Sequence, residues 1–353
     1  MTDSPTVLYT DPAWLLRDGR PDPQLAGIER AALADVDLRF GPHDGDRYVT
    51  TGPALHAAAA GVRVLVVYRC QVTPQLLQAA GPGLQAVIRQ GVGVDNLHAE
   101  LLAERGIAAY NIPDYCVAEV AAHTAAFALA LERRLVPQHL GLTGGTFDIY
   151  AGGIPRRLSD QTLGIVGFGR IGRAVARQLG PFYGRTLVFD PYLGADLAEG
   201  YGARAVPTLT ELLSGSDLVT LHCPLDETTD GMLDEAAFTA MRRGAYLINA
   251  ARGRLVDPQA LAAALADGQI AGAALDVFSP ENPHTDPRWK PVLEHPGVLV
   301  TSHRAFLSTQ AETSSRRRVA QIVRDVLDGN PVRVGTVQVG TVQVGAAQAG
   351  PPR

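Results

Sequence analysis

Short runs of apolar residues alternate with longer amphipathic segments along most of this chain. An unbroken apolar run of about four to eight residues is typical of a strand buried on both faces, whereas the intervening segments have helical spacing. Strands that alternate with helices form parallel βαβ units. The N-terminal third is expected to contain strands at residues 7–9, 62–67, 84–89 and 107–110, and helices at residues 53–60, 74–80 and 98–105.

The same alternation continues after a long Ala-rich helical segment at residues 117–134. From residue 163 onward it predicts about six strands, enough for a complete doubly wound sheet. These strands are expected at residues 163–166, 186–189, 217–222, 245–249, 271–277 and 298–301, with helices at residues 208–213, 234–242, 257–266 and 316–327.

One turn in the second set of strands carries three glycines, Gly167, Gly169 and Gly172. It follows a strand and opens a helix, and the next strand ends at Asp190. In a dinucleotide site the three glycines allow a sharp turn, close approach of the pyrophosphate, and tight packing of the helix on the strand. The helix N-terminus attracts the phosphates, and the acid accepts hydrogen bonds from the ribose. The stretch therefore predicts a dinucleotide-binding site.

The composition argues against several other classes of protein. The 353 residues are 46% hydrophobic and 19% charged, as expected for a soluble protein with two domains. A net charge of −5 gives no reason to expect a nucleic-acid or membrane partner. The cysteines at 70, 116 and 223 are few and far apart, so we expect neither a disulfide framework nor a metal site. With no signal-peptide pattern and no long apolar run, a cytoplasmic location is expected.

Some segments carry weaker signals. The Gly-rich residues 141–153 are interpreted as an exposed, irregular excursion that forms an inter-subunit arm. Residues 335–353 repeat the pentapeptide GTVQV and predict a low-complexity, mostly disordered tail, with strand addition as a minor alternative. Glu119 and His123 lie four residues apart on one helix, and we assign no chemistry to this common arrangement.

Polar residues follow the last three predicted strands. Arg252 comes after residue 249, Asp276 and Glu281 end or follow the next strand, and His303 follows the last. Singly, each is best interpreted as a surface or capping residue. Together they lie at strand ends that face one crevice of a doubly wound sheet. An arginine binds a carboxylate with two hydrogen bonds, and a histidine donates a proton to a keto oxygen. A glutamate holds the imidazole and raises its pKa. This set suits the reduction of a 2-keto acid.

In this order, the motifs resemble those of the D-isomer-specific 2-hydroxyacid dehydrogenases over roughly residues 62–318. The motifs are GVGVDNLHAELLAERGIAAYNIP, GIVGFGRIG, SDLVTLHCPLDETT, LINAARGRLVDPQAL, GAALDVFSPENP and VLVTSHRA. The resemblance implies that Arg252, Glu281 and His303 are the catalytic residues. It implies a homodimer as well.

The resemblance also implies a set of cofactor contacts, with Asp276 at the carboxamide and Asp190 at the ribose. Because no arginine adjoins Asp190, NAD is favoured over NADP. The implied cofactor residues are Gly167, Gly169, Arg170, Ile171, Gly172, Asp190, His222, Pro224, Thr228 and Asp276.

For the substrate, the resemblance implies that the backbone amides of residues 68–71 hold the carboxylate together with Arg252. The implied substrate residues are Tyr68, Arg69, Cys70, Gly93, Arg252 and Phe306. Phe306 replaces the usual glycine after His-x-Ala, as in the branch similar to the C-terminal-binding-protein co-repressors and their bacterial relatives. Phe306 adds bulk near the pocket, and Tyr68 and Arg69 replace smaller residues, so the substrate side chain stays open.

We therefore expect an α/β protein with a Rossmann-type dinucleotide domain and a flavodoxin-like, discontinuous substrate domain, with the active site in the cleft between them. The expected boundaries are 1–117 with 307–334 for the substrate domain and 118–306 for the NAD-binding domain. The expected function is NAD(H)-dependent interconversion of a 2-keto acid and a D-2-hydroxy acid. A phosphite or phosphonate dehydrogenase and a co-repressor-like NAD(H)-sensing protein are the alternatives. Glu281 argues against formate oxidation, in which a glutamine partners the histidine.

Overall fold

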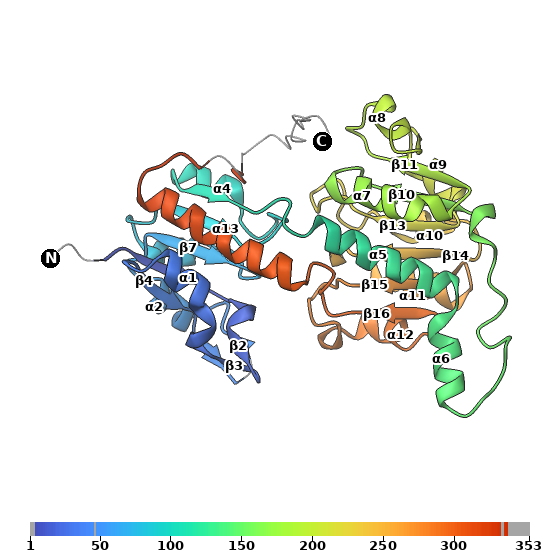
Figure 1. Ribbon diagram of the computed structural model, residues 1–353, viewed down its shortest axis with the longest axis horizontal. Coiled ribbons are helices and arrows are strands. Elements are labelled where there is room, and N and C mark those ends of the chain that lie inside the picture. The colour runs from blue at the N-terminus through green and yellow to red at the C-terminus, as the bar shows by residue number, and fades with distance from the viewer. Residues whose placement is uncertain (1–3, 46, 333–334, 338–353) are drawn as a thin grey trace. The chain divides into compact units, whose positions relative to one another are not determined.

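The chain divides into two compact units in the computed structural model, which describes residues 4–45, 47–332 and 335–337 (Figure 1). Unit 1 contains the described residues up to Tyr115 and those from Ser308 onward, and unit 2 is Cys116–Leu307. These divisions lie close to the predicted boundaries at 117/118 and 306/307.

Unit 1 is built on a five-stranded parallel sheet with the order β4-β1-β7-β8-β9. Renumbered along the chain, this order is 2-1-3-4-5, that of flavodoxin-like folds, as predicted. The strands are β1 (Thr6–Tyr9), β4 (Asp37–Phe40), β7 (Val64–Val67), β8 (Ala86–Arg89) and β9 (Ala108–Tyr110). The sequence did not predict β4, because this edge strand alternates exposed and half-buried residues instead of forming an apolar run.

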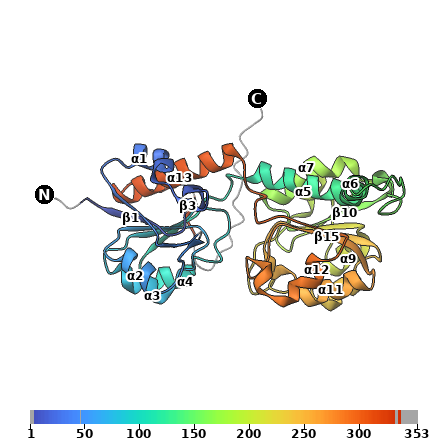
Figure 2. The ribbon, with the colours of Figure 1, turned by 90° about the horizontal axis from the view of Figure 1, so that it is seen from below.

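Helices cover both faces of this sheet, with α1 and α13 on one face and α2, α3 and α4 on the other (Figure 2). Successive strand side chains point to opposite faces. Val7 accordingly packs in one core with Val319 of α13, whereas Leu8 packs in the other with Leu76 of α3. The helices are α1 (Gly27–Ala32), α2 (Pro53–Ala59), α3 (Pro74–Ala80), α4 (Ala99–Glu104) and α13 (Thr309–Leu327).

Unit 2 is built on a seven-stranded parallel sheet with the order β12-β11-β10-β13-β14-β15-β16. This is the Rossmann order 3-2-1-4-5-6 with one strand added, so the predicted fold class is confirmed. The strands are β10 (Thr162–Val166), β11 (Arg185–Phe189), β12 (Arg204–Ala205), β13 (Leu218–Leu221), β14 (Ala245–Asn249), β15 (Ile270–Leu275) and β16 (Val298–Val300).

Two apolar cores lie on the two faces of this sheet. Ile165 packs toward α5 and α7, and Val166, the next residue, packs on the face that α9, α10, α11 and α12 cover (Figure 2). The helices are α5 (Val117–Glu132), α6 (Leu135–Thr143), α7 (Arg170–Leu179), α8 (Ala195–Glu199), α9 (Leu209–Gly215), α10 (Glu235–Ala240), α11 (Pro258–Ala266) and α12 (Lys290–Leu293).

Shorter elements complete the two units. Two small hairpins pair β2 (Leu16–Arg17) with β3 (Arg20–Pro21) and β5 (His43–Asp44) with β6 (Arg47–Tyr48). The 3₁₀ helices are η1 (Ala13–Leu15), η2 (Pro23–Ala26), η3 (Leu158–Asp160), η4 (Gly180–Phe182), η5 (Gly253–Leu255), η6 (Pro283–Thr285) and η7 (Pro287–Trp289). Among the described residues, the helices are too short or too polar to cross a lipid bilayer.

Three predicted segments need correction. The excursion at 141–153 begins as helix, because α6 extends to Thr143. Helix α13 starts at Thr309 instead of residue 316, because the Ser308 hydroxyl caps it by accepting from the Ala311 N–H. The predicted disorder of the tail is wrong for residues 335–337, because Thr336 pairs with Tyr110 at the sheet edge. The rest of the predicted tail, 338–353, lies outside the described residues.

Candidate active site

The three predicted catalytic residues follow three neighbouring strands of unit 2. Arg252 comes after β14, Glu281 after β15 and His303 after β16. Adjacent strands lie about 4.8 Å apart, and parallel strands end at the same edge of a sheet. The topology therefore brings the three side chains to one edge of unit 2.

His303 and Glu281 form a direct pair, with His303 Nδ1 2.6 Å from Glu281 Oε1. An ionised carboxylate only accepts hydrogen bonds, so the proton of the neutral imidazole lies on Nδ1. His303 Nε2 is then left to exchange a proton with a ligand. The side chains are 23% and 42% exposed, so a small molecule can reach them.

The His303 loop is held by a buried aspartate at the end of β15. Asp276, which is 1% exposed, accepts the Arg304 N–H at 2.9 Å and the Ala305 N–H at 2.9 Å, while its backbone oxygen accepts the His303 N–H at 2.7 Å. These bonds fix His303 at a φ of +55°, which a residue with a side chain rarely adopts. The contacts of Asp276 thus hold the loop, and its carboxamide contact stays a prediction.

A second histidine, His123 of α5, adjoins this network. The Thr301 hydroxyl donates to Asp276 Oδ1 at 2.5 Å and lies 3.1 Å from His123 Nε2. A hydroxyl has one proton, so it accepts from His123, which therefore carries a proton on Nε2. Burial, opposed by the nearby Asp276 carboxylate, lowers the pKa of His123. No role was predicted for His123, although Thr301 and Asp276 follow neighbouring strands and could have marked the edge that it contacts.

The Arg252 loop packs closely on the segment that leads to Glu281. A side chain on Gly253 would lie 2.1 Å from the Phe278 backbone carbon, so only glycine allows this contact. Asn249 Nδ2 donates to the Arg252 carbonyl at 2.8 Å, and Arg252 Nη1 donates to the Ala251 carbonyl at 2.8 Å. Both bonds restrict the arginine at the strand end.

The three glycines of the predicted dinucleotide turn have different surroundings. Gly167 has a φ of +88°, and a Cβ there would lie 2.5 Å from the Cys223 nitrogen. A Cβ on Gly172 would lie 2.1 Å from the Gly167 carbonyl oxygen, so the start of α7 packs directly on the turn. A Cβ on Gly169 would meet nothing within 4 Å. That open space is where a pyrophosphate would approach the backbone.

The start of α7 and the end of β11 also suit a dinucleotide. Gly169, at the N-cap of α7, provides no side-chain cap, whereas Thr208, Asp234 and Asp257 cap α9, α10 and α11. Asp190 accepts the Phe168 N–H at 2.8 Å and so fixes the turn, with capacity left for ribose hydroxyls. The residues present therefore fit NAD.

The other predicted cofactor residues lie at the same edge, on loops or in the first turn of α7. Burial lowers the pKa of His222, which follows β13, to about 3, so its imidazole is neutral. Its ring lies 2.9 Å from the Thr220 hydroxyl. The Thr228 hydroxyl donates to Asp226 in an exposed turn. Pro224, Arg170 and Ile171 lie at the surface or partly exposed. Their contacts with the cofactor stay predictions.

The predicted substrate residues of unit 1 follow β7 and β8. The guanidinium carbons of Arg69 and Arg89 each lie 5.4 Å from the Tyr68 ring centroid. Cys70 is fully buried, and burial, together with the Asp11 charge, raises the pKa of its thiol to about 12, so the thiol is neither reactive nor accessible. Gly93, in the turn after β8, is partly exposed.

Phe306 lies beside the candidate proton donor. Its ring centroid is 6.3 Å from that of His303, with an edge-to-face angle of 83°. Both belong to the loop after β16 that Asp276 holds. Among the described residues, His, Cys, Asp and Glu form no group of three that could hold a metal ion.

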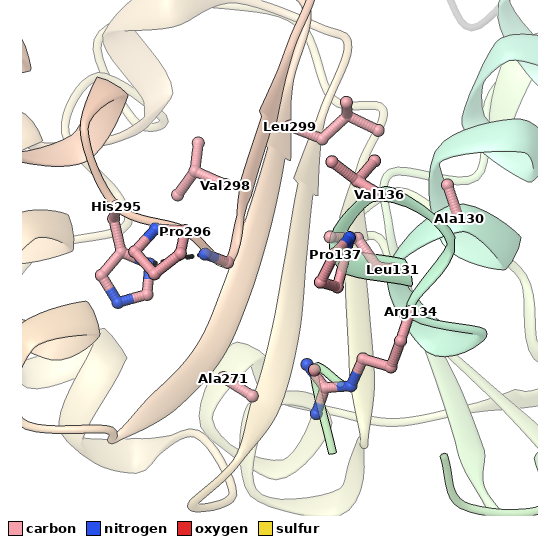
Figure 3. A pocket seen from close by; sticks show the side chains of 12 residues that line it. Ala130, Leu131, Arg134, Val136, Pro137, Ala271, His295, Pro296, Val298 and Leu299 are labelled. Carbon is pink, nitrogen blue, oxygen red and sulfur yellow. Dashed lines mark hydrogen bonds between the residues drawn. The ribbon is translucent and has the colours of Figure 1, made fainter. Parts of the chain in front are cut away.

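A pocket of about 250 Å³ lies elsewhere in unit 2 (Figure 3). It is lined mainly by apolar side chains where α5 passes into α6, and by the segment that enters β16. Residues such as Leu131, Val136, Pro137, Val298 and Leu299 line it, with Arg134 at one side. None of the predicted catalytic or cofactor residues belongs to this pocket.

Residues 125–305 match the model of the D-isomer specific 2-hydroxyacid dehydrogenase family, NAD binding domain. The match covers just over half of the chain, which therefore belongs to this family. This part of unit 2 is thus an NAD-binding domain, as the glycine turn and Asp190 predicted.

Two curated relatives are D-3-phosphoglycerate dehydrogenases. The protein of Methanocaldococcus jannaschii is 34% identical over 73% of this chain and 48% of its own length, and that of Mycobacterium bovis is 33% identical over 87% and 56%. This chain thus spans about half the length of these curated relatives. A similar solved structure is D-lactate dehydrogenase from Aquifex aeolicus complexed with NAD and lactic acid. The two structures match with a TM-score of 0.80 and 28% identity. The match covers 92% of this chain and 96% of the lactate dehydrogenase chain.

Proposed function

We propose that this protein interconverts a 2-keto acid and a D-2-hydroxy acid with NAD(H). The observation that carries the proposal is the 2.6 Å pair of His303 and Glu281, which lies beside the strand that carries Arg252 in a family NAD-binding domain. The nicotinamide, when bound, supplies or accepts the hydride. The side chains of this chain must bind the acid, orient it and move one proton.

His303 Nε2 is the atom that donates the proton during reduction. The carbonyl carbon gains a hydride while its oxygen gains this proton, and the oxidation reverses both transfers. Glu281 holds the ring and stabilises the imidazolium that precedes proton donation. Arg252 binds the substrate carboxylate with two hydrogen bonds and polarises the neighbouring carbonyl.

Asp190 supports the proposal that NAD is preferred to NADP. Its carboxylate lies at the end of β11, where it would repel a 2′-phosphate and accept from two ribose hydroxyls. Tyr68, Arg69 and Phe306 are proposed to contact the variable part of the substrate. We propose a cytoplasmic location as well, because the chain has only three cysteines and they lie far apart in the sequence.

A spectrophotometric assay of NADH oxidation tests the function. Glyoxylate, hydroxypyruvate, phenylpyruvate and longer keto acids are compared for wild type and His303→Ala. We expect at least one keto acid to be reduced, with kcat about 10²- to 10⁴-fold lower in the variant. His284→Ala, exposed in η6, is the matched control. Equal rates in wild type and His303→Ala would contradict the proposal.

The two alternatives predict different results in this assay and in an NADH-binding titration. NAD reduction with phosphite, but without any keto-acid turnover, would indicate a phosphite dehydrogenase. Tight NADH binding without turnover of any compound would indicate a sensing protein. Both results exclude the proposed reaction.

We further propose a homodimer that covers the projecting residues of α6 and the loop after it (Figure 1). Phe147, Ile149 and Ile154 are 87%, 71% and 75% exposed, more than large apolar side chains of a monomer usually are. The apolar pocket at the α5–α6 junction extends this surface. Light scattering of wild type and Phe147→Asp would test the proposal, and a wild-type monomer at micromolar concentration would refute it.

A further inference from the structure

The loop after β7 carries an internal carboxylate on its backbone. Asp11, two residues beyond β1, accepts the N–H groups of Tyr68, Arg69 and Cys70 at 2.9, 2.6 and 2.9 Å. The Thr10 hydroxyl donates to the same carboxylate at 2.6 Å. Three consecutive amides that converge on one anion form a nest.

The carbonyl groups of the same loop are fixed from another strand end. Asn96 Nδ2 donates to the Cys70 carbonyl at 2.9 Å and lies 3.4 Å from the Tyr68 carbonyl. The loop is therefore held through its donors by Asp11 and through its acceptors by Asn96. Asp11 follows β1 and Asn96 follows β8, the two strands on either side of β7 in the unit 1 sheet.

The Asp11 charge is well buried and well satisfied. The residue is 5% exposed, and its carboxylate has four donors. A buried charge is stable only when it is paired and hydrogen-bonded. A substrate carboxylate that took the same three N–H groups would leave Asp11 buried with Thr10 alone. The exchange would also bring two negative charges together.

We propose that Asp11 is a positioning residue that occupies the amide nest permanently, so the loop selects its substrate through the side chains of Tyr68 and Arg69. The substrate carboxylate is then bound by arginine without the N–H groups of residues 68–70, three of the four loop amides that the family resemblance implies. This inference rests on the proposed function. It also explains why Cys70 is buried, since its N–H serves Asp11 and its side chain faces the core.

Replacement of Asp11 by alanine empties the nest and tests the proposal. We expect the KM of the keto acid to rise about tenfold or more, with kcat changed less than about threefold and the Kd of NADH unchanged. Added formate supplies the missing carboxylate and should restore most of kcat/KM in Asp11→Ala without affecting wild type. A reaction without keto acid corrects for any formate oxidation. Asp22→Ala removes another aspartate that accepts a backbone N–H, at an exposed turn, and should change nothing.

A direct probe of the loop does not depend on turnover. Amide hydrogen exchange at residues 68–70 should be at least about tenfold faster in Asp11→Ala and should slow again with formate. If wild type turns over no keto acid, the proposed function fails, and exchange alone decides the role of Asp11. If Asp11→Ala does not fold, Asp11→Asn replaces it, because it keeps an acceptor oxygen but presents an NH₂ to the remaining donors.

Two results would overturn the proposal. A lower KM in Asp11→Ala would mean that Asp11 competes with the substrate for the amides. Unchanged exchange at residues 68–70 would mean that the loop does not depend on this carboxylate.

Discussion

The glycine turn of unit 2 and the Tyr68–Gln71 loop of unit 1 occupy equivalent places, yet they treat their backbone donors differently. Each follows a parallel strand at the carboxyl edge of a sheet, where open α/β proteins bind ligands. Helix α7 begins without a side-chain cap, and the space beside Gly169 is open. In the other loop, Asp11 fills three consecutive amides.

The difference shows that the position of a loop does not identify its ligand. Open donors and a glycine without neighbours indicate that a molecule from outside completes the turn. Donors that an internal carboxylate satisfies indicate a rigid loop that presents side chains. The His303 loop is also rigid in this sense, because the Asp276 carboxylate accepts two of its amides and the loop presents the His303 side chain.

Substitutions of Gly167 and Gly169 should have the largest and most clearly separated effects. Alanine at 167 places a Cβ 2.5 Å from the Cys223 nitrogen at a φ of +88°. It should lower the free energy of unfolding by at least about 2 kcal/mol. Alanine at 169 meets nothing within 4 Å, so stability should hold while NADH binds at least about tenfold more weakly. Urea unfolding and NADH fluorescence titration measure the two effects. Equal NADH affinity in Gly169→Ala and wild type would contradict the open-donor interpretation.

The sequence predicts features that depend on local periodicity. The strands β10 and β14 are buried along their whole length, so their positions in the sequence follow from the local run of apolar residues alone. The glycine turn was predictable because its residues lie between two such runs. Strand β4 was missed because half-buried edge strands do not form apolar runs.

The contacts that hold the site depend on sheet order, which local sequence does not contain. Asp11 and Arg69 are 58 residues apart and meet because β1 and β7 are neighbours. His123 and Thr301 are 178 residues apart and meet because α5 packs near the end of β16. A carboxylate just beyond a strand is a signal of such contacts, but the partner is known only once the order of the strands is known.

Substitution of Thr301 should have the next largest effect. It tests whether internal hydrogen bonds hold the His303 loop, as those of Asp11 hold the Tyr68–Gln71 loop. Thr301→Val keeps the shape but removes the hydroxyl that links His123 to Asp276. A hydrogen bond to a charged group contributes about 1.5–3 kcal/mol. Without it Asp276 is held less firmly, and Asp276 holds the His303 loop, so the proton donor is less well placed. We therefore expect kcat to fall about tenfold or more. Steady-state assays over pH should show the fall in kcat, and NADH fluorescence titration should show little change in Kd. Thr301→Ser should recover activity, and Thr239→Val, on exposed α10, should behave as wild type. A variant that lowers stability but not kcat would assign Thr301 a purely structural role.

The smallest effect concerns the acid stability of the glycine turn, whose neighbour His222 is kept neutral. Burial lowers the pKa of His222 to about 3, whereas an unfolded histidine titrates near about 6.5. Between these values the unfolded chain binds a proton that the folded chain does not. Stability should therefore rise with pH across this window and level off above it. One such group contributes at most about 1.4 kcal/mol per pH unit. Urea unfolding of His222→Gln between pH 4.5 and 7.5 should show a shallower slope than wild type, whereas His284→Gln, exposed in η6, should keep the wild-type slope. Parallel slopes for wild type and His222→Gln would mean that the imidazole beside the turn gains its proton without loss of packing.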